Sequence, residues 1–344
     1  MVTGIVRDWR YLNHDMGPHH VESPARLEVI YRMIEAEPAF KDLKAIEPRE
    51  ATEEEILLVH YRSYLEKIKE TKGKPRVILD PDTSTCALSY ETALLAVGGV
   101  LEAAQAIMEK RVDNAFALIR PPGHHAESSR AMGFCLFNNV AIAARWLRKK
   151  YGLERILIVD WDLHHGNGTQ HAFYQEKEVF YFSTHQFPYY PGTGNWDEVG
   201  EGEGLGFTFN VPLSPGKGDS EYLFIYKEFL TPIVYRYQPQ FILVSAGFDI
   251  YAGDPLGGMM VSAEGFAALA SQLMAFARET CEGRLLLVLE GGYSLEGLKN
   301  GVKEIIFQLA GLRNPPTKEP VISALVRKEL APAWHNLELY WPSA

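Results

Sequence analysis

One stretch of the sequence restricts the fold more than any other: residues 155–169, RILIVDWDLHHGNGT. Its apolar, β-branched run at residues 156–159 is too short for a helix and is bounded by charged residues, which is typical of a fully buried parallel strand. Four side chains that can bind a metal follow at once: Asp160, Asp162, His164 and His165. Carboxylates and imidazoles at the end of a buried strand need partners or a cation, so the stretch predicts a metal site.

Asp162 and His164 are the first candidate ligands. They are two residues apart, so in an extended segment both side chains point to the same side. One carboxylate oxygen and one imidazole nitrogen suit zinc, which in catalytic sites takes a third protein ligand and keeps one position open. Asp249, at the end of SAGFD, is the candidate third ligand. Two carboxylates cancel the charge of a dication and acidify bound water less than imidazoles would, so we expect a separate general base.

The pattern of an apolar run followed by polar residues recurs along the chain. Strands are predicted at five places, residues 115–119, 156–159, 179–182, 241–244 and 285–289. Helical segments are expected between them, at residues 138–150, 220–237 and 263–279. This alternation predicts an α/β fold with a largely parallel, multi-stranded sheet and helices on both faces. In such sheets the active site lies beyond the carboxyl ends of the strands, where all five runs deliver polar residues.

The remaining segments predict further helices and no domain boundary. Residues 52–70 have an acidic beginning and a basic end, as a single helix prefers, and a helix rich in small residues is expected over residues 89–110. The sequence has no linker, low-complexity tract or internal repeat. We therefore expect one domain over residues 1–344, with a C-terminal extension, residues 318–344, packed on its body.

Composition limits the partners and the compartment. The net charge of −10, without any Lys/Arg run, argues against nucleic acid as the main partner but leaves a cationic substrate open. Three cysteines without a CxxC pair are typical of reduced thiols in a cytoplasmic protein. No apolar run approaches the ~18 residues of a membrane span, and residues 1–15 lack the apolar region of a signal peptide. The expected location is the cytoplasm, with no membrane partner.

Two further motifs supply groups for acid–base catalysis. His124 and His125 follow RPPG and are imidazoles that titrate near neutral pH. Tyr293 follows the glycine pair 291–292 and offers a phenol that can hydrogen-bond a developing oxyanion. Taken singly, these residues have structural explanations as satisfied loop histidines and an ordinary aromatic. Beside the predicted metal ligands, the catalytic interpretation is favoured.

The motifs together carry a family resemblance. RPPGHHA, GFCLFNN, DWDLHHGNGTQ, PGTG, SAGFD, DPLGG and LEGGY, in this order and spacing, resemble the zinc-dependent histone deacetylase family. That family includes bacterial deacetylase-like proteins and acetylpolyamine amidohydrolases and has the arginase–deacetylase fold. The resemblance is strongest over residues 14–302. It implies an amidohydrolase that removes acetyl or other acyl groups from Nε-acyl-lysine or similar acylated amines through metal-activated water.

The resemblance also implies roles for single residues. It places zinc, with ferrous iron as the other metal left open, on Asp162, His164 and Asp249. It makes His125 the general base and later the acid. The other implied catalytic residues are His124 as an electrostatic partner held by Asp160, Asn167 as the partner of His125, and Tyr293 as the group that polarises the carbonyl.

The same resemblance implies a substrate channel and a structural potassium site. Gly133, Phe134 and Tyr190 match positions that line an acyl-lysine channel, and two aromatic walls suit an aliphatic tether. A structural potassium ion is implied on four residues: Asp160 and Ser183, with the main-chain carbonyls of Asp162 and His164.

Two positions refine the subtype. Asn167 stands where class I enzymes carry a second aspartate, and a neutral partner raises the pKa of His125 less than a carboxylate would. Leu256 stands at the channel position where the polyamine-selective class II member has a glutamate. Three interpretations stay open: a deacylase for acyl-lysine or similar amines, an acetylpolyamine amidohydrolase, and a non-catalytic regulator that binds acyl groups or metal. The sequence leaves the substrate, the acyl length, the metal and the oligomeric state open.

Overall fold

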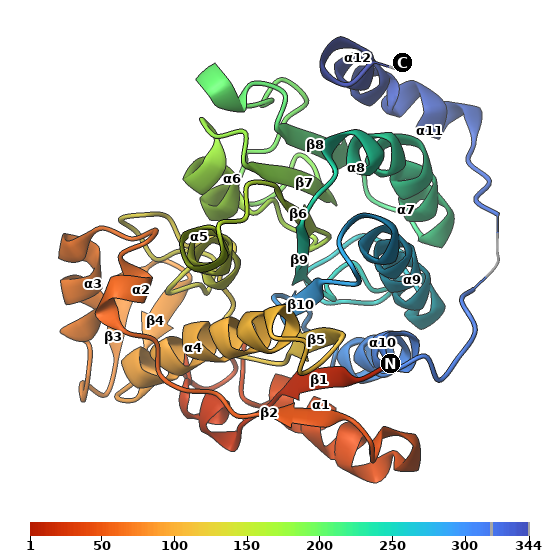
Figure 1. Cartoon of the computed structure of the whole chain (residues 1–344). Helices are drawn as coiled ribbons and strands as arrows, with labels where there is room; N and C mark the ends of the chain where they lie inside the picture. The colour runs from red at the N-terminus through yellow and green to blue at the C-terminus, as the bar shows by residue number, and fades with distance from the viewer. Residues whose placement is uncertain (317–318, 343–344) are drawn as a thin grey trace.

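Eight parallel strands form the central sheet of the computed structural model, which describes residues 1–316 and 319–342 (Figure 1). Their order across the sheet is β2-β1-β5-β10-β9-β6-β7-β8. The strands are β1 (Thr3–Val6), β2 (Lys44–Ile46), β5 (Asn114–Ala117), β6 (Ile156–Asp160), β7 (Val179–Gln186), β8 (Thr208–Leu213), β9 (Phe241–Ala246) and β10 (Leu285–Leu289). A separate antiparallel pair consists of β3 (Val77–Asp80) and β4 (Thr83–Thr85). The predicted parallel α/β fold is confirmed.

Helices cover both faces of this sheet (Figure 1). Helices α4 and α5 pack on one face, and α1, α9 and α10 pack together on the other. The helices of the described residues are α1 (Ala25–Ala36), α2 (Glu53–Ile56), α3 (Arg62–Lys69), α4 (Ser89–Met108), α5 (Asn139–Tyr151), α6 (Asn167–Phe173), α7 (Asp219–Ile225), α8 (Thr231–Tyr237), α9 (Ala263–Thr280), α10 (Leu295–Leu309), α11 (Ala324–Glu329) and α12 (Ala331–Tyr340).

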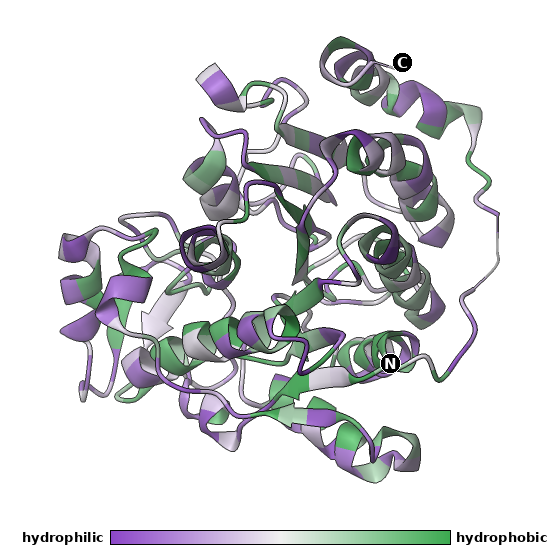
Figure 2. Cartoon of the chain, in the orientation of Figure 1, coloured by the Kyte–Doolittle hydropathy of each residue, from purple (hydrophilic) through white to green (hydrophobic). Residues whose placement is uncertain are grey.

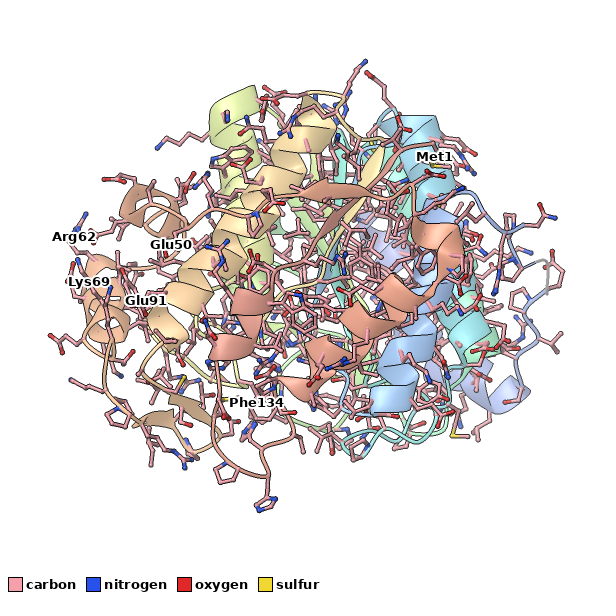
Figure 3. The ribbon with its side chains drawn as sticks, turned by 90° about the horizontal axis from the view of Figure 1, so that it is seen from below. Met1, Glu50, Arg62, Lys69, Glu91 and Phe134 are labelled. Atoms are coloured by element: carbon pink, nitrogen blue, oxygen red, sulfur yellow. The ribbon has the colours of Figure 1, made fainter. Side chains whose placement is uncertain are left out.

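The hydrophobic core is formed around the central strands of the sheet. All residues of β6, β9 and β10 are buried, and Figure 2 shows these strands as hydrophobic while hydrophilic residues mark the outer sides of the helices. Continuous apolar runs are what strands covered on both faces require. Of the charged residues labelled in Figure 3, Glu50, Arg62 and Lys69 are exposed, and Lys69 pairs with Glu53 at 2.6 Å.

Three strands of the sheet have no clear counterpart in the sequence pattern. β1 and β2 have only four and three residues, too few for a readable alternation. β8 contains Pro212, which cannot donate to a ladder and is tolerated here because β8 lies at the edge of the sheet. β7 is also longer than expected, so Ser183 and His185 lie within the strand and not after it.

The helix predicted over residues 52–70 is wrong, because the chain forms two short helices there. The break lies at His60, which is 2% exposed and binds the carbonyl of Glu127 through Nδ1 at 2.9 Å. The next residue, Tyr61, donates its backbone N–H to the Ser128 carbonyl at 2.9 Å. Because that N–H is bound outside the helix, the first helix cannot continue into the second.

The helix expected over residues 220–237 is also interrupted. Residues 226–230 form a π-helical turn between α7 and α8. Pro232 follows in the first turn of α8, and its ring nitrogen cannot donate to the carbonyl of Glu228. The residue before this proline, Thr231, donates its hydroxyl to the carbonyl of Tyr226 at 3.0 Å, within the π-helical turn.

The expectation that no segment has the length of a membrane span needs a correction. Among the described residues, α4 is long and apolar enough by length and composition, and 78% of its most apolar window is buried inside the protein. Its small residues allow close packing: a Cβ at Gly98 would lie 1.9 Å from the carbonyl oxygen of Arg49. The apolar character of α4 therefore matches its place between the sheet and the segment that contains Arg49.

The C-terminal segment lies against the body of the protein. Trp341 donates its indole N–H to the Gly206 carbonyl at 2.7 Å, and Trp334 meets Phe229 edge to face with ring centroids 4.7 Å apart. Of the expected extension over residues 318–344, Lys318 and residues 343–344 lie outside the described residues.

Candidate active site

The candidate site residues gather where four adjacent strands end. β5, β10, β9 and β6 are neighbours in the sheet, and each is followed by a loop that carries predicted site residues. Since parallel strands deliver their carboxyl ends to the same edge, these loops meet there. Figure 3 shows Phe134, from the GFCLFNN motif, in the lower half of the view and Met1, which precedes β1, in the upper half.

Asp162, His164 and Asp249 form a buried cluster with one candidate ligand atom each, all within 4.8 Å of one another. His164 Nδ1 lies 3.2 Å from Asp162 Oδ1 and 3.2 Å from Asp249 Oδ2. Ligand bonds of about 2.0–2.2 Å at a tetrahedral ion place neighbouring ligand atoms roughly 3.3 Å apart, so these spacings fit a divalent metal. Asp162 and His164 lie in an irregular turn after β6 and not in the extended segment that the sequence suggested.

One oxygen of this cluster has no hydrogen-bond donor among the described residues. Asp249 Oδ1 accepts from the backbone N–H of Leu163 at 2.8 Å, but the buried Oδ2 has only the His164 ring nitrogen at 3.2 Å, which makes no hydrogen bond to it. A Cβ at Gly291 would lie 2.3 Å from that oxygen and 2.6 Å from Asp162 Oδ2, so only glycine allows the backbone to approach both carboxylates. The donor set and the unsatisfied oxygen both fit a bound cation.

The fourth metal-capable residue of the opening stretch, His165, lies outside the cluster. Its Nδ1 is 2.7 Å from the Thr193 hydroxyl and its Nε2 is 2.8 Å from Gln170 Oε1, so both ring nitrogens are engaged. Burial lowers its pKa well below the ordinary value. His165 is therefore a neutral, hydrogen-bonded core histidine.

His124 is placed against carboxylates. Its Nδ1 lies 3.1 Å from Asp160 Oδ2, and its Nε2 lies 3.8 Å from Asp162 Oδ1. Burial works against the charged ring, but the carboxylates of Asp162 and Asp160 outweigh it and raise the pKa of His124 to about 10. Asp160 is held in turn by the Tyr181 hydroxyl, which donates to it at 3.0 Å.

His125 has a neutral partner. Its Nδ1 lies 2.7 Å from Asn167 Oδ1, and the amide nitrogen of Asn167 donates to Glu127. Burial lowers the pKa of His125 well below its ordinary value, and the neighbouring His124 and His164 lower it further. The two adjacent histidines thus differ in charge: His124 is held cationic and His125 neutral.

Tyr293 is held through its backbone as well as its ring. Its N–H donates to Asp254 Oδ2 at 2.7 Å, and the Arg26 guanidinium lies 5.1 Å from its ring centroid. Arg26 also donates to the carbonyls of Gly292 at 2.6 Å and Glu290 at 2.5 Å. Burial raises the pKa of the Tyr293 phenol well above its usual value, so it remains a proton donor at neutral pH.

Aromatic side chains surround the histidines and Tyr293. Phe134 meets Tyr293 edge to face at 5.8 Å between centroids, and Tyr190 meets His125 edge to face at 5.2 Å. Gly133 has φ +56°, and a Cβ there would lie 2.2 Å from Cδ2 of His125. Leu256 is joined to these aromatic residues through its main-chain carbonyl, which accepts a hydrogen bond from the Tyr189 hydroxyl at 2.8 Å.

The residues of the implied potassium site lie close to the same strand ends. Asp160 and Ser183 are register partners on the neighbouring strands β6 and β7. The Ser183 hydroxyl is 2.9 Å from Nδ1 of His185. Thr184, the next residue of β7, has a buried hydroxyl without a hydrogen-bond partner among the described residues.

Four residues near the site were not named as candidates from the sequence. Tyr189 stacks on His164 at 5.6 Å, and Asp82 accepts from the backbone N–H of Gly133 at 3.0 Å. Asp254 and Glu290 are buried carboxylates that bind backbone N–H groups of other loops. The acids of DPLGG and LEGGY could have been suspected because the motifs are unusual, but their partners are far away in the sequence.

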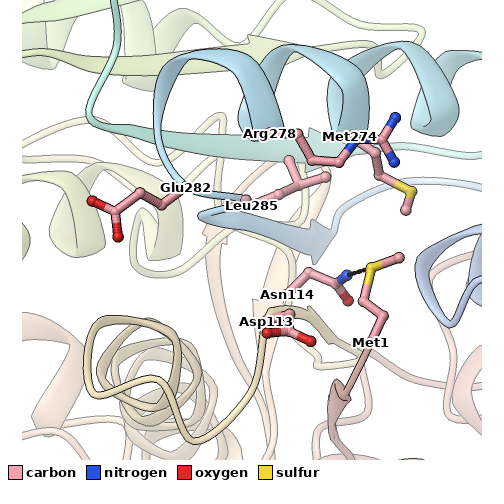
Figure 4. A pocket seen from close by; sticks show the side chains of 8 residues that line it. Met1, Asp113, Asn114, Met274, Arg278, Glu282 and Leu285 are labelled. Carbon is pink, nitrogen blue, oxygen red and sulfur yellow. Dashed lines mark hydrogen bonds between the residues drawn. The ribbon is translucent and has the colours of Figure 1, made fainter.

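A cavity of about 270 Å³ lies at the opposite edge of the sheet (Figure 4). Its lining includes Asn114 and Leu285, the first residues of β5 and β10, together with Met1. None of the predicted site residues lines it. The cavity at the amino ends of the strands therefore contains none of the candidate metal ligands or catalytic residues that lie at their carboxyl ends.

The sequence and the structure are similar to known deacetylases. Residues 20–309 match the model of the histone deacetylase domain family. The "Probable deacetylase" of Archaeoglobus fulgidus is 42% identical, over 98% of this chain and 96% of that protein. The "Polyamine deacetylase HDAC10" of Danio rerio is 41% identical, over 86% of this chain and 45% of that protein.

Other relatives extend the similarity to fungi and to a solved structure. The "Histone deacetylase HDA1" of Candida albicans is 39% identical, over 91% of this chain and 41% of that protein. The chain thus spans about half or less of these eukaryotic relatives. The crystal structure of the HDA15 HD domain matches 99% of this chain and 95% of that chain with a TM-score of 0.92 and 36% identity.

Proposed function

The chain belongs to the histone deacetylase family and is a hydrolytic deacetylase, and we propose that it removes acetyl or other acyl groups from Nε-acyl-lysine or a similar acylated amine in a metal-dependent reaction. The observation that carries the proposal is the buried cluster of Asp162, His164 and Asp249 beside two histidines of different charge. Zinc suits this donor set, and ferrous iron is the alternative.

The three clustered side chains would hold the ion. When bound, it would supply a Lewis acid that polarises the acyl carbonyl and acidifies water. The Tyr293 phenol, a donor at neutral pH, would hydrogen-bond the carbonyl oxygen as it becomes negative. Phe134 and Tyr190 would hold the aliphatic tether of the substrate between them.

His125 would move the proton. A neutral imidazole can accept a proton from the attacking water, and a cationic one cannot, so the lowered pKa of His125 favours it as the base. The protonated ring would then pass the proton to the leaving amine. His124, held cationic by Asp160 and Asp162, would stabilise negative charge that develops beside it. Asn167 would orient His125 by binding its Nδ1 at 2.7 Å.

A structural potassium ion is part of the same proposal. Asp160 and Ser183, paired in register on β6 and β7, would contribute side-chain oxygens to it. The carbonyls of Asp162 and His164 would complete it, in the loop that also carries the divalent ligands. The ion would then stiffen the turn on which the catalytic cluster depends.

Acetylpolyamines are the second candidate substrates. Asp82 lies beside Gly133 at the aromatic wall, and a carboxylate there would attract a cationic amine. A polyamine deacetylase is also among the relatives. Against this, Leu256 stands at the position where the resemblance expects a glutamate in a polyamine-selective enzyme. Acyl-lysine therefore remains the first choice.

The test combines metal content with a substrate panel. Asp249→Ala should lose stoichiometric metal and turnover, while Asp197→Ala, at an exposed aspartate, should keep both. Both variants and the wild type would be assayed on acetyl-lysine peptides, longer acyl-lysines and acetylpolyamines. Retention of zinc at wild-type affinity by Asp249→Ala would refute the ligand assignment. Turnover that is faster on acetylpolyamines than on every acyl-lysine would favour the second candidate.

A further inference from the structure

Glu290 is a buried carboxylate to which the proposed reaction assigns no role. It follows β10 directly and is 0% exposed. Its Oε2 accepts hydrogen bonds from the backbone N–H groups of Gly123 at 2.6 Å and His124 at 3.2 Å. Its Oε1 accepts from the Ser245 hydroxyl at 3.1 Å. The carboxylate is therefore fully engaged by groups that lie 45 or more residues away in the sequence.

These contacts connect two loops of the candidate site and the carboxyl end of β9. β10 lies between β5 and β9 in the sheet. The loop after β5 carries His124 and His125, the loop after β10 carries Tyr293, and β9 leads through Ser245 to the loop with Asp249. One side chain thus links the loop of the proposed base and the loop of the proposed carbonyl-polarising group to the strand that precedes a proposed ligand.

The contacts of Glu290 are hydrogen bonds and not an ion pair. Among residues 1–316 and 319–342, no Lys or Arg side chain pairs with its carboxylate, and Arg26 donates only to its main-chain carbonyl. Hydrogen bonds to two successive backbone N–H groups fix the position of a loop, because both must be met by the same oxygen. The arrangement depends on the reach and shape of the side chain.

We propose that Glu290 is a positioning residue that holds the His124–His125 loop in register with the Tyr293 loop. The inference rests on the proposed function, because that function assigns the base to one of these loops and the carbonyl-polarising group to the other. Glu290 itself does not touch the substrate. It acts through the backbone of Gly123 and His124.

Four variants would test the proposal by steady-state kinetics. Glu290→Ala should lower kcat about 10²-fold and leave KM within about threefold, because a displacement of about 1 Å costs turnover of that order. Glu290→Gln should stay within about threefold of wild type, since its carbonyl can accept from both N–H groups and its amide can donate to Ser245. Glu290→Asp, which keeps the charge but is one methylene shorter, should lose kcat as Glu290→Ala does. Ser245→Ala should cost less than Glu290→Ala.

Hydrogen exchange gives a readout that does not depend on activity. The backbone amides of Gly123 and His124 should exchange faster in Glu290→Ala and Glu290→Asp than in wild type, and at the wild-type rate in Glu290→Gln. If the wild type turned over none of the substrates, the proposed function would be wrong. Hydrogen exchange would still test whether Glu290 holds the backbone of Gly123 and His124. If Glu290→Ala failed to fold, the comparison of Glu290→Gln with Glu290→Asp would decide.

Three outcomes would overturn the proposal. One is unchanged exchange at Gly123 and His124 in Glu290→Ala. Another is Glu290→Asp active and Glu290→Gln inactive, which would mean that the charge matters and not the reach. The last is a raised KM with normal kcat in Glu290→Ala, which would indicate a role in substrate binding.

Discussion

Two clusters of buried charge lie close to the ends of the central strands and differ in one respect. In the Glu22 cluster (Glu22, Arg26 and Arg120), Glu22 Oε1 accepts from Arg120 Nε at 2.5 Å and from Arg26 at 3.0 Å, and Oε2 accepts from Arg120 at 2.7 Å. In the Asp249 cluster (Asp162, His164 and Asp249), one buried carboxylate oxygen has no donor among the described residues. The first cluster is complete within the protein, and the second is not.

The pKa values of Glu22 and Asp249 are shifted in opposite directions, in agreement with this difference in hydrogen bonding. Burial acts to raise the pKa of Glu22, but Arg120 outweighs it and holds that pKa well below the usual range. Burial and the neighbouring Asp162 carboxylate raise the pKa of Asp249 to about 7. A buried charge that is paired and fully hydrogen-bonded contributes to the fold, whereas a buried oxygen without a hydrogen bond is available to a cation. The comparison separates a cluster whose charges are satisfied within the protein from one that can take a cation.

The largest expected effect is on activity beside the Asp249 cluster. His125→Ala should remove nearly all turnover, roughly 10⁴-fold, because the neutral ring is the proposed proton carrier. His124→Ala should leave measurable activity, because the role of His124 is electrostatic. Steady-state kcat on an acetyl-lysine peptide would check this for metal-loaded variants. If His124→Ala were the more damaging change, the two roles would be reversed.

The next effect is on stability and belongs to the Glu22 cluster. Glu22→Ala should destabilise the fold by about 3–5 kcal/mol, because it leaves two buried guanidinium groups without their carboxylate. Glu28→Ala removes an exposed partner of Arg32 in α1 and should cost less than about 0.5 kcal/mol. Chemical denaturation would measure both. A small effect of Glu22→Ala would mean that water or other groups satisfy the two guanidinium groups when the carboxylate is removed.

The Glu22 contribution should also depend on pH with a defined sign. A carboxyl group whose pKa is lowered by folding contributes stability that is present above its unfolded pKa, about 4.3, and is lost as the pH falls below that value. The stability difference between wild type and Glu22→Ala should therefore be full at pH 7 and shrink below about pH 4.

Tyr293 lies between the two clusters, with Arg26 over its ring and the carboxylates of Asp249 and Asp162 acting on its phenol. Tyr293→Phe should keep the fold and the metal and lower kcat ~10²–10³-fold, about 2.7–4 kcal/mol, because one donor to the developing oxyanion is lost. Metal analysis and steady-state kinetics would measure this. Near-normal kcat would show that another group polarises the carbonyl.

Metal addition should stabilise the protein through the Asp249 cluster. Free zinc at 100 times its Kd should add about 2.7 kcal/mol to the free energy of unfolding of metal-free protein, and Asp249→Ala should lose this gain. The raised pKa of Asp249 favours its protonated form in the metal-free fold, and this contribution to stability is lost as the pH rises through about 7. At a fixed free zinc concentration the gain should be larger at pH 8 than at pH 6, because protons compete with the metal and raise its Kd at the lower pH. An equal gain in wild type and Asp249→Ala would place the ion elsewhere.

The smallest expected effect concerns the partner of His125. Asn167→Asp places a carboxylate beside Nδ1 of His125, now 2.7 Å from a neutral oxygen, and should raise the pKa of that ring. The acidic limb of kcat/KM against pH should therefore move upward by about one unit, although the two histidines can titrate as a pair. An unmoved limb in a folded, metal-loaded variant would show that His125 is not the group that the limb reports.

Local pattern was sufficient for the elements that deliver the site. β6 and β10 were predicted within one residue at each end because their runs are continuously apolar, and α9 was predicted within one residue as the helix between two such runs. The three residues of the Asp249 cluster were also predicted, since carboxylates and an imidazole directly after buried strands have few other uses. Whether they hold a metal, and the roles of His124, His125 and Tyr293, stay predictions.

Only the tertiary structure decided what surrounds those residues. The break at His60, the place of Asp82 beside Gly133 and the contact of Glu290 with Gly123 each join segments 51 to 167 residues apart. The sequence determined which side chains would stand at the ends of the strands, because burial patterns are local and repeat with the period of the element. It could not determine their partners, because those follow from the order of strands in the sheet, and no local period records which strand lies beside which.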